Sequence, residues 1–101
     1  MNSKVEVICD YIKNKCKRNG VILKEVRNQD PIDYISIHNN QGDLASISAS
    51  TIILEPASYS PKWTKYIKKW ATEEGFPDDK IKNQNLIRQI SPDEAVDFLS
   101  R

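Results

Sequence analysis

The stretch YISIHNNQGDLASIS, residues 34–48, carries the clearest structural signal in the chain. Isoleucine or alanine alternates with serine, tyrosine or histidine on both sides of NNQG, and a period of two is typical of strands with one buried face. The segment 39–42 is rich in residues that adopt positive φ in tight turns, so the stretch predicts a β-hairpin. We expect its strands to cover Ile32–His38 and Leu44–Leu54, the second strand being bent and ending before Pro56.

One further strand is predicted ahead of the hairpin. Val21–Val26 is apolar and β-branched enough to form it, and Asn28, Asp30 and Pro31 then interrupt the strand pattern. Together with the hairpin this gives a three-stranded antiparallel sheet.

An amphipathic helix is predicted before the sheet, over Ser3–Asn19. Ser3 and Glu6 have the spacing of a capping box, and Gly20 is a natural helix stop. The apolar residues at helical spacing are Val5, Ile8, Cys9, Ile12 and Cys16. This stripe would cover the sheet.

Two more helices are predicted after the sheet. Ser60 and Pro61 begin a helix over Pro61–Glu74, and Gly75 ends it. Ser91 and Pro92 begin a short last helix with an acidic first turn. Residues 78–85 read as a polar loop, and the apolar cluster 86–90 fits a strand or a helix. The fold class predicted for residues 1–101 is therefore one α+β domain: an N-terminal helix, a three-stranded antiparallel sheet, an amphipathic helix packed on the sheet and a short C-terminal helix.

Length and charge exclude several classes of protein. A chain of 101 residues supports one hydrophobic core. Its formal net charge of +1 excludes a whole-protein attraction to nucleic acid or anionic lipid, although a local patch stays open. No apolar run approaches the ~18 residues of a membrane span, and the charged residues Lys4, Glu6 and Asp10 do not fit a signal peptide.

The helix predicted over 61–74 has an unusual charge order. Lys62 and Lys65 lie at its start and Glu73 and Glu74 at its end, which opposes the helix dipole. At about 100° per residue, an aromatic and apolar arc is flanked by lysines. The arc contains Trp63, Tyr66, Ile67 and Trp70, and the lysines beside it are Lys62, Lys65 and Lys69. The arc either packs in the core beneath solvated lysines or forms an edge that binds a partner.

Catalytic signatures are sparse. The chain has one histidine, His38, and its two cysteines, Cys9 and Cys16, are too far apart along a helix for a disulfide and lack zinc-site spacing. Three glycines cannot form a phosphate-binding loop or a dinucleotide fingerprint. Asp78 and Asp79 are adjacent carboxylates in the predicted loop and favour solvation over metal binding. We therefore predict no catalytic residue, no metal and no cofactor.

These observations favour a small non-enzymatic protein-binding domain, acting as an inhibitor, adaptor or regulatory subunit. The residues predicted to contact the partner are Lys62, Lys65, Tyr66 and Lys69. The alternative is a nucleic-acid-binding module that uses the same lysine and aromatic residues of helix 61–74. Unpaired thiols suit the cytoplasm, and the abundance of Lys, Ile and Asn suits a phage or mobile element of an AT-rich bacterium.

Self-association is also open at this stage. Val7 and Tyr11 lie four residues apart, on a different face of the first helix from its apolar stripe. A homodimer through these residues, or along an uncovered edge strand, is compatible with the sequence.

Overall fold

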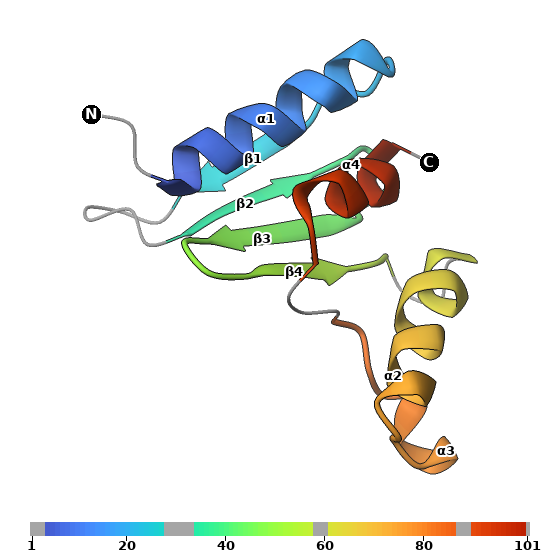
Figure 1. Cartoon of the computed structure of the whole chain (residues 1–101). Helices are drawn as coiled ribbons and strands as arrows, with labels where there is room; N and C mark the ends of the chain where they lie inside the picture. The colour runs from blue at the N-terminus through green and yellow to red at the C-terminus, as the bar shows by residue number, and fades with distance from the viewer. Residues whose placement is uncertain (1–3, 28–33, 58–60, 87–89, 101) are drawn as a thin grey trace.

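The computed structural model describes residues 4–27, 34–57, 61–86 and 90–100 and has an α+β fold (Figure 1). Its elements in chain order are α1 (Lys4–Arg18), β1 (Lys24–Arg27), β2 (Tyr34–His38), β3 (Leu44–Ser48), β4 (Ile52–Glu55), η1 (Trp63–Lys68), α2 (Lys69–Glu73), α3 (Asp78–Ile81) and α4 (Pro92–Ser100). The predicted fold class is confirmed. η1 is a π-helical segment that continues directly into α2.

The sheet has four antiparallel strands in the order β1-β2-β3-β4, where the sequence predicted three. The predicted strand Leu44–Leu54 is two strands, because the chain reverses between Ser48 and Thr51. The Ser48 amide donates to the Thr51 carbonyl at 2.9 Å, and their hydroxyls lie 2.8 Å apart. This turn contains Ala49 and Ser50 and lacks the Asn or Gly that usually marks a hairpin. Because apolar and polar residues continue to alternate across it, the sequence pattern does not reveal the turn.

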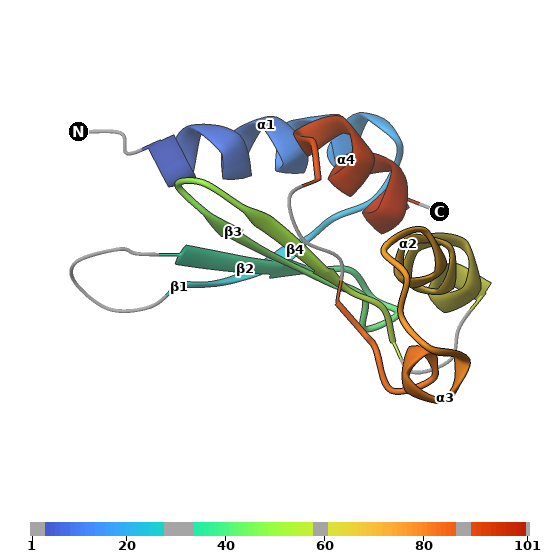
Figure 2. The ribbon, with the colours of Figure 1, turned by 60° about the horizontal axis from the view of Figure 1, so that its bottom comes forward.

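The core lies between one face of the sheet and the helices α1 and α4, which cover that face side by side (Figure 2). Antiparallel pairing places Ile37 opposite Ala45, and Ala45 opposite Leu54, so their side chains point to the same side of the sheet. The buried residues of α1 are Val5, Cys9, Ile12 and Cys16, and those of α4 are Ala95, Val96, Phe98 and Leu99. The stripe predicted on the first helix thus forms half of the helical layer.

The helix formed by residues 61–73 lies beside the end of the sheet, next to α4 (Figures 1 and 2). The prediction that this helix packs on a face of the sheet is therefore wrong. Ile67 is fully buried in the core cluster, and the Tyr66 ring meets the Phe98 ring edge-on with centroids 5.2 Å apart. The helix ends as expected at Gly75, whose φ is 84°. The Phe76 amide then donates to the Ala71 carbonyl at 3.0 Å, which closes the terminus.

The helix starts are confirmed in part. The Ser91 hydroxyl accepts from the Glu94 amide at 3.2 Å, which is one of the two bonds of the predicted capping box of α4; the Glu94 carboxylate accepts from the Ser91 hydroxyl at 3.3 Å. Ser3 and Ser60 lie outside the described residues, as does most of the cluster 86–90. The segment predicted as a polar loop contains the short helix α3, which buries Ile81.

Phe98 of α4 links the helix of residues 61–73 to the layer formed by α1 and α4. Its fully buried ring contacts Tyr66 and lies within the main core. Replacing it with alanine would remove that contact and leave a cavity. We expect Phe98→Ala to lower the free energy of unfolding by about 3–5 kcal/mol. Urea denaturation followed by circular dichroism measures this. The control Val7→Ala removes a side chain that is 55% exposed and should change stability by less than about 0.5 kcal/mol. Equal losses for both variants would contradict this description of the core.

Candidate functional site

A hollow of about 430 Å³ lies at the start of the helix formed by residues 61–73. It is lined by Gln41, Asp43, Ala57, Pro61, Lys62, Lys65 and Tyr66, and we call it the Tyr66 hollow. The structure therefore brings together three of the four predicted contact residues, Lys62, Lys65 and Tyr66. The fourth, Lys69, is exposed on α2 and lies outside the hollow.

The π-helical segment η1 determines which side chains reach the hollow. A π-helix hydrogen-bonds from residue i to i+5, so each turn holds more residues than in an α-helix. An angular step of 100° therefore misplaces residues across Trp63–Lys68. The predicted aromatic arc still faces inward, since Trp63, Tyr66 and Trp70 pack against the core cluster. The lysines, by contrast, have three different environments.

Lys62 is a structural residue of the hollow. Its ammonium group lies 2.8 Å from the Asp43 carboxylate, and the two side chains are only 11% and 2% exposed. The same ammonium lies 5.3 Å from the centre of the Phe98 ring. Lys62 thus joins the start of the helix to the β2–β3 hairpin and to α4, so its charge is neutralised inside the protein.

Asp43 is a residue that the sequence analysis did not single out. Its carboxylate accepts hydrogen bonds from the Lys62 ammonium, from the Asn39 side-chain amide at 2.9 Å and from the Ala57 backbone amide at 2.9 Å. Burial alone would raise the pKa of Asp43, but these three donors together lower it below its usual value. The carboxylate is therefore ionised at neutral pH, and it holds Lys62 and the Ala57 backbone in place where all three residues line the hollow.

Lys65 and Tyr66 form the rim. The Lys65 side chain is 57% exposed, and its ammonium lies 3.7 Å from the Asp97 carboxylate and 5.2 Å from the centre of the Tyr66 ring. The Tyr66 hydroxyl donates to the same Asp97 carboxylate. An exposed ammonium group thus lies beside a half-buried aromatic ring at the mouth of the hollow.

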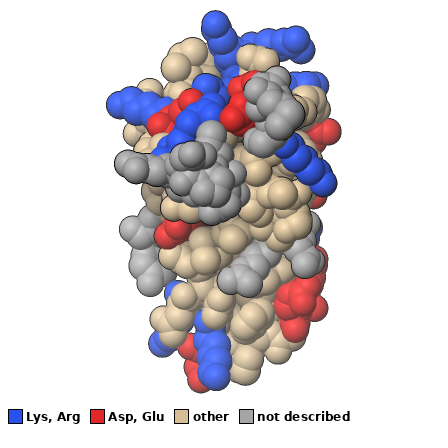
Figure 3. All heavy atoms as spheres, turned by 90° about the vertical axis from the view of Figure 1, so that its left-hand side faces the viewer, with Lys and Arg blue, Asp and Glu red and all other residues tan. Residues whose placement is uncertain are grey.

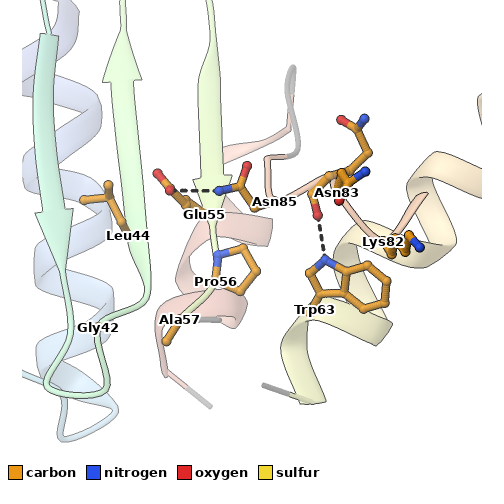
Figure 4. Close-up of a pocket in the computed structure, with 10 residues that line it drawn as sticks. Gly42, Leu44, Glu55, Pro56, Ala57, Trp63, Lys82, Asn83 and Asn85 are labelled. Carbon is orange, nitrogen blue, oxygen red and sulfur yellow. Dashed lines mark hydrogen bonds between the residues drawn. The ribbon is translucent and has the colours of Figure 1, made fainter. Parts of the chain in front are cut away.

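A second depression, of about 540 Å³, lies on the other side of the helix start, and Ala57 lines both. We call it the Trp63 cleft. Figure 4 shows the Trp63 indole on one wall, donating to the Gln84 carbonyl at 2.6 Å. The Asn85 side chain donates to the Glu55 carboxylate at 3.1 Å across the cleft. Polar groups on both walls therefore already bind one another.

The residues considered for catalysis lie apart. His38 is on the sheet face away from α1 and α4, paired with Lys24 and Leu44 across the strands. Cys9 and Cys16 are buried free thiols. Burial, with Glu25 beside it, raises the pKa of Cys9 to about 11, so this thiol stays protonated and is a weak nucleophile at neutral pH. Among the described residues, no three His, Cys, Asp or Glu side chains group closely enough to hold a metal ion.

No family model matches the chain, and neither a curated protein nor a solved structure matches it. Within the part of the chain that the structure describes, no helix is long and apolar enough to cross a membrane.

Removing one member of the buried pair leaves the other charge without its partner. We expect Asp43→Ala and Lys62→Met each to cost about 3 kcal/mol or more, and the double variant to cost well below the sum. A double-mutant cycle by urea denaturation measures the coupling. The matched control is the partly exposed pair Lys13–Glu25, 3.1 Å apart, whose coupling should stay below about 1 kcal/mol. Simple additivity at Asp43 and Lys62 would contradict the assignment.

The lowered pKa of Asp43 makes stability depend on pH in a defined direction. The folded-state pKa lies below the unfolded value of about 3.9, so the stabilisation is complete above about pH 5. It is lost as the pH falls through the folded-state pKa. Asp43→Asn cannot titrate, so its free energy of unfolding should fall less steeply than that of the wild type between about pH 5 and 2. Parallel curves would contradict this, and the exposed Asp78→Asn variant serves as the control.

Proposed function

We propose that this chain is a small, non-enzymatic, cytoplasmic protein-binding domain that acts as an inhibitor, adaptor or regulatory subunit. The Tyr66 hollow is the proposed contact site for its partner. The observation that carries the proposal is the exposed Lys65 ammonium beside the half-buried Tyr66 ring, at the mouth of a hollow of about 430 Å³.

The lining of the Tyr66 hollow suits a side chain of another protein. Ala57, Pro61 and the Tyr66 ring offer apolar surface, and the buried pair of Lys62 and Asp43 adds no net charge. An apolar or aromatic anchor that fills such a hollow is the usual centre of a protein interface. Lys65 at the rim favours an anchor that is followed by an acidic residue.

The alternative, a nucleic-acid-binding module, has weaker support. Phosphate binding draws on several cations that release counterions, and of the two lysines at the hollow Lys62 is already neutralised by Asp43, which leaves only Lys65. Figure 3 shows basic and acidic side chains mixed at the α1 end of the face that it presents. One observation favours the alternative: Lys68 and Lys69 are both exposed and adjacent on the same helix, so their ammonium groups could contact neighbouring phosphates.

A non-enzymatic role is supported by the state of the nucleophiles. The Cys9 thiol is buried and protonated at neutral pH, and His38 lies on a strand whose cross-strand neighbours there are Lys24 and Leu44. Neither arrangement gives a nucleophile paired with a base. The two buried free thiols also agree with a reducing compartment.

Lys65→Glu should weaken partner binding by about tenfold or more, because it reverses the exposed charge at the rim. Lys68→Glu is the matched control, since it makes the same charge change at another exposed position of the same helix. Nuclease-treated extract from the native host is passed over each immobilised variant. Proteins retained by the wild type and by the control, and lost from Lys65→Glu, are then titrated by calorimetry.

Three results would count against this site and role. Equal retention of the same protein by both variants would exclude the Tyr66 hollow as the contact. Loss of all retention after nuclease treatment, with affinity falling steeply as salt rises, would favour the nucleic-acid alternative. Turnover of a substrate by the purified chain, abolished by substitution of His38, would exclude a non-enzymatic role.

A further inference from the structure

No helix in the described parts of the chain lies across the sheet face opposite α1 and α4 (Figure 2), and at one corner of this face Leu44 and Glu55 line the Trp63 cleft together with residues 82–85. Pairing across the four strands arranges its side chains in rows. One row runs Lys24, His38, Leu44, Glu55, and the next runs Val26, Ser36, Ser46, Ile53. We call these two rows the open face. It has an apolar residue at each edge of the second row and opposite charges at the two edges of the first.

The centre of the open face needs no outside hydrogen-bond partner. The Ser36 and Ser46 hydroxyls lie 3.3 Å apart and hydrogen-bond each other. Serine side chains are short, so another sheet could approach the middle strands closely. Val26 at the edge is 56% exposed, which is a large fraction for a valine on a strand.

The open face is complementary to itself under one rotation. A twofold axis parallel to the strands, between β2 and β3, exchanges β1 with β4 and β2 with β3 while keeping each row at its level. Lys24 of one copy then lies opposite Glu55 of the other, whose carboxylate also accepts from Asn85 of its own chain at 3.1 Å. Val26 lies opposite Ile53. In the same operation Ser36 faces Ser46, and His38 faces Leu44. Both edge contacts occur twice, as in any isologous interface.

We propose that a second copy of this chain packs on the open face, so that two sheets face each other in a homodimer. Face-to-face sheets lie about 10 Å apart and cross at about −30°, and the long side chains of Lys24 and Glu55 can span the resulting offset. The charges favour a second copy over an unrelated protein. Lys24 and Glu55 are matched to each other under the twofold rotation, and binding to a different protein would not require that match.

The area of the open face indicates how tightly the proposed dimer would associate. Four strands spaced about 4.8 Å apart, with a rise of about 3.3 Å per residue, give a sheet face on the order of 300 Å². This is below the ~800 Å² per partner of a standard interface. The dimer should therefore be weak, with a dissociation constant between about 10 and 500 µM.

Sedimentation velocity from about 5 to 500 µM protein tests the proposal, since this range brackets a micromolar dissociation constant. The wild type should shift from monomer to dimer as concentration rises. Lys24→Glu and Glu55→Lys should each weaken dimerisation by about fivefold or more, because each places two like charges together. The double variant Lys24→Glu with Glu55→Lys restores the charge match, so it should dimerise more tightly than either single variant, although Glu55→Lys also removes the hydrogen bond from Asn85.

A second pair of variants tests the apolar contact. Val26→Lys should abolish the dimer, and Val7→Lys should leave it intact, although the two valines are almost equally exposed at 56% and 55%. A wild type that stays monomeric across the range would overturn the proposal. A dimer unaffected by Val26→Lys, or lost with Val7→Lys, would also overturn it and place the contact elsewhere, in the second case on α1. A charge double variant that dimerises no more tightly than the single variants would exclude the twofold arrangement. These outcomes do not depend on the Tyr66 hollow.

Discussion

The buried Asp43 carboxylate is the contact on which the arrangement of the second half of the chain depends. It lies at the start of β3 and receives hydrogen bonds from the β2–β3 turn, from the residue after Pro56 and from Lys62 ahead of η1. These three segments are joined to one another through a single side chain. An ionised group this deeply buried is stable only while its donors stay in place, so it fixes where the helix of residues 61–73 begins.

Local signals in the sequence predicted most of the fold. The hairpin turn forms as expected, with Gly42 at φ 90° and the Asn39 side chain accepting from the amides of Gln41 and Asp43. These features depend on residues within a few positions of one another. The turn at residues 49–51 was missed, because Ser48 and Thr51 close it with hydroxyl groups and the apolar alternation continues on both sides.

The candidate site was only partly predictable, for a physical reason. Helical spacing identified Lys62, Lys65 and Tyr66, but it could not separate a buried lysine from an exposed one. That difference arises from Asp43, which is nineteen residues away from Lys62 in the sequence. The π-helical geometry of η1 also changes the angular positions on which the helical wheel relies. Lys69 accordingly lies away from the hollow.

The two thiols of α1 give the protein an internal reporter of its own opening motions. Cys9 and Cys16 are fully buried at the inner surface of that helix, where reagents in solution cannot contact the sulfur atoms. Alkylation of Cys9 therefore requires α1 to separate from the sheet, whereas Cys16 contacts Val96 and Ser100 and is also exposed when α4 separates from α1. The labelling rate then measures the free energy of that separation in the unmodified chain, and it distinguishes partial from complete unfolding.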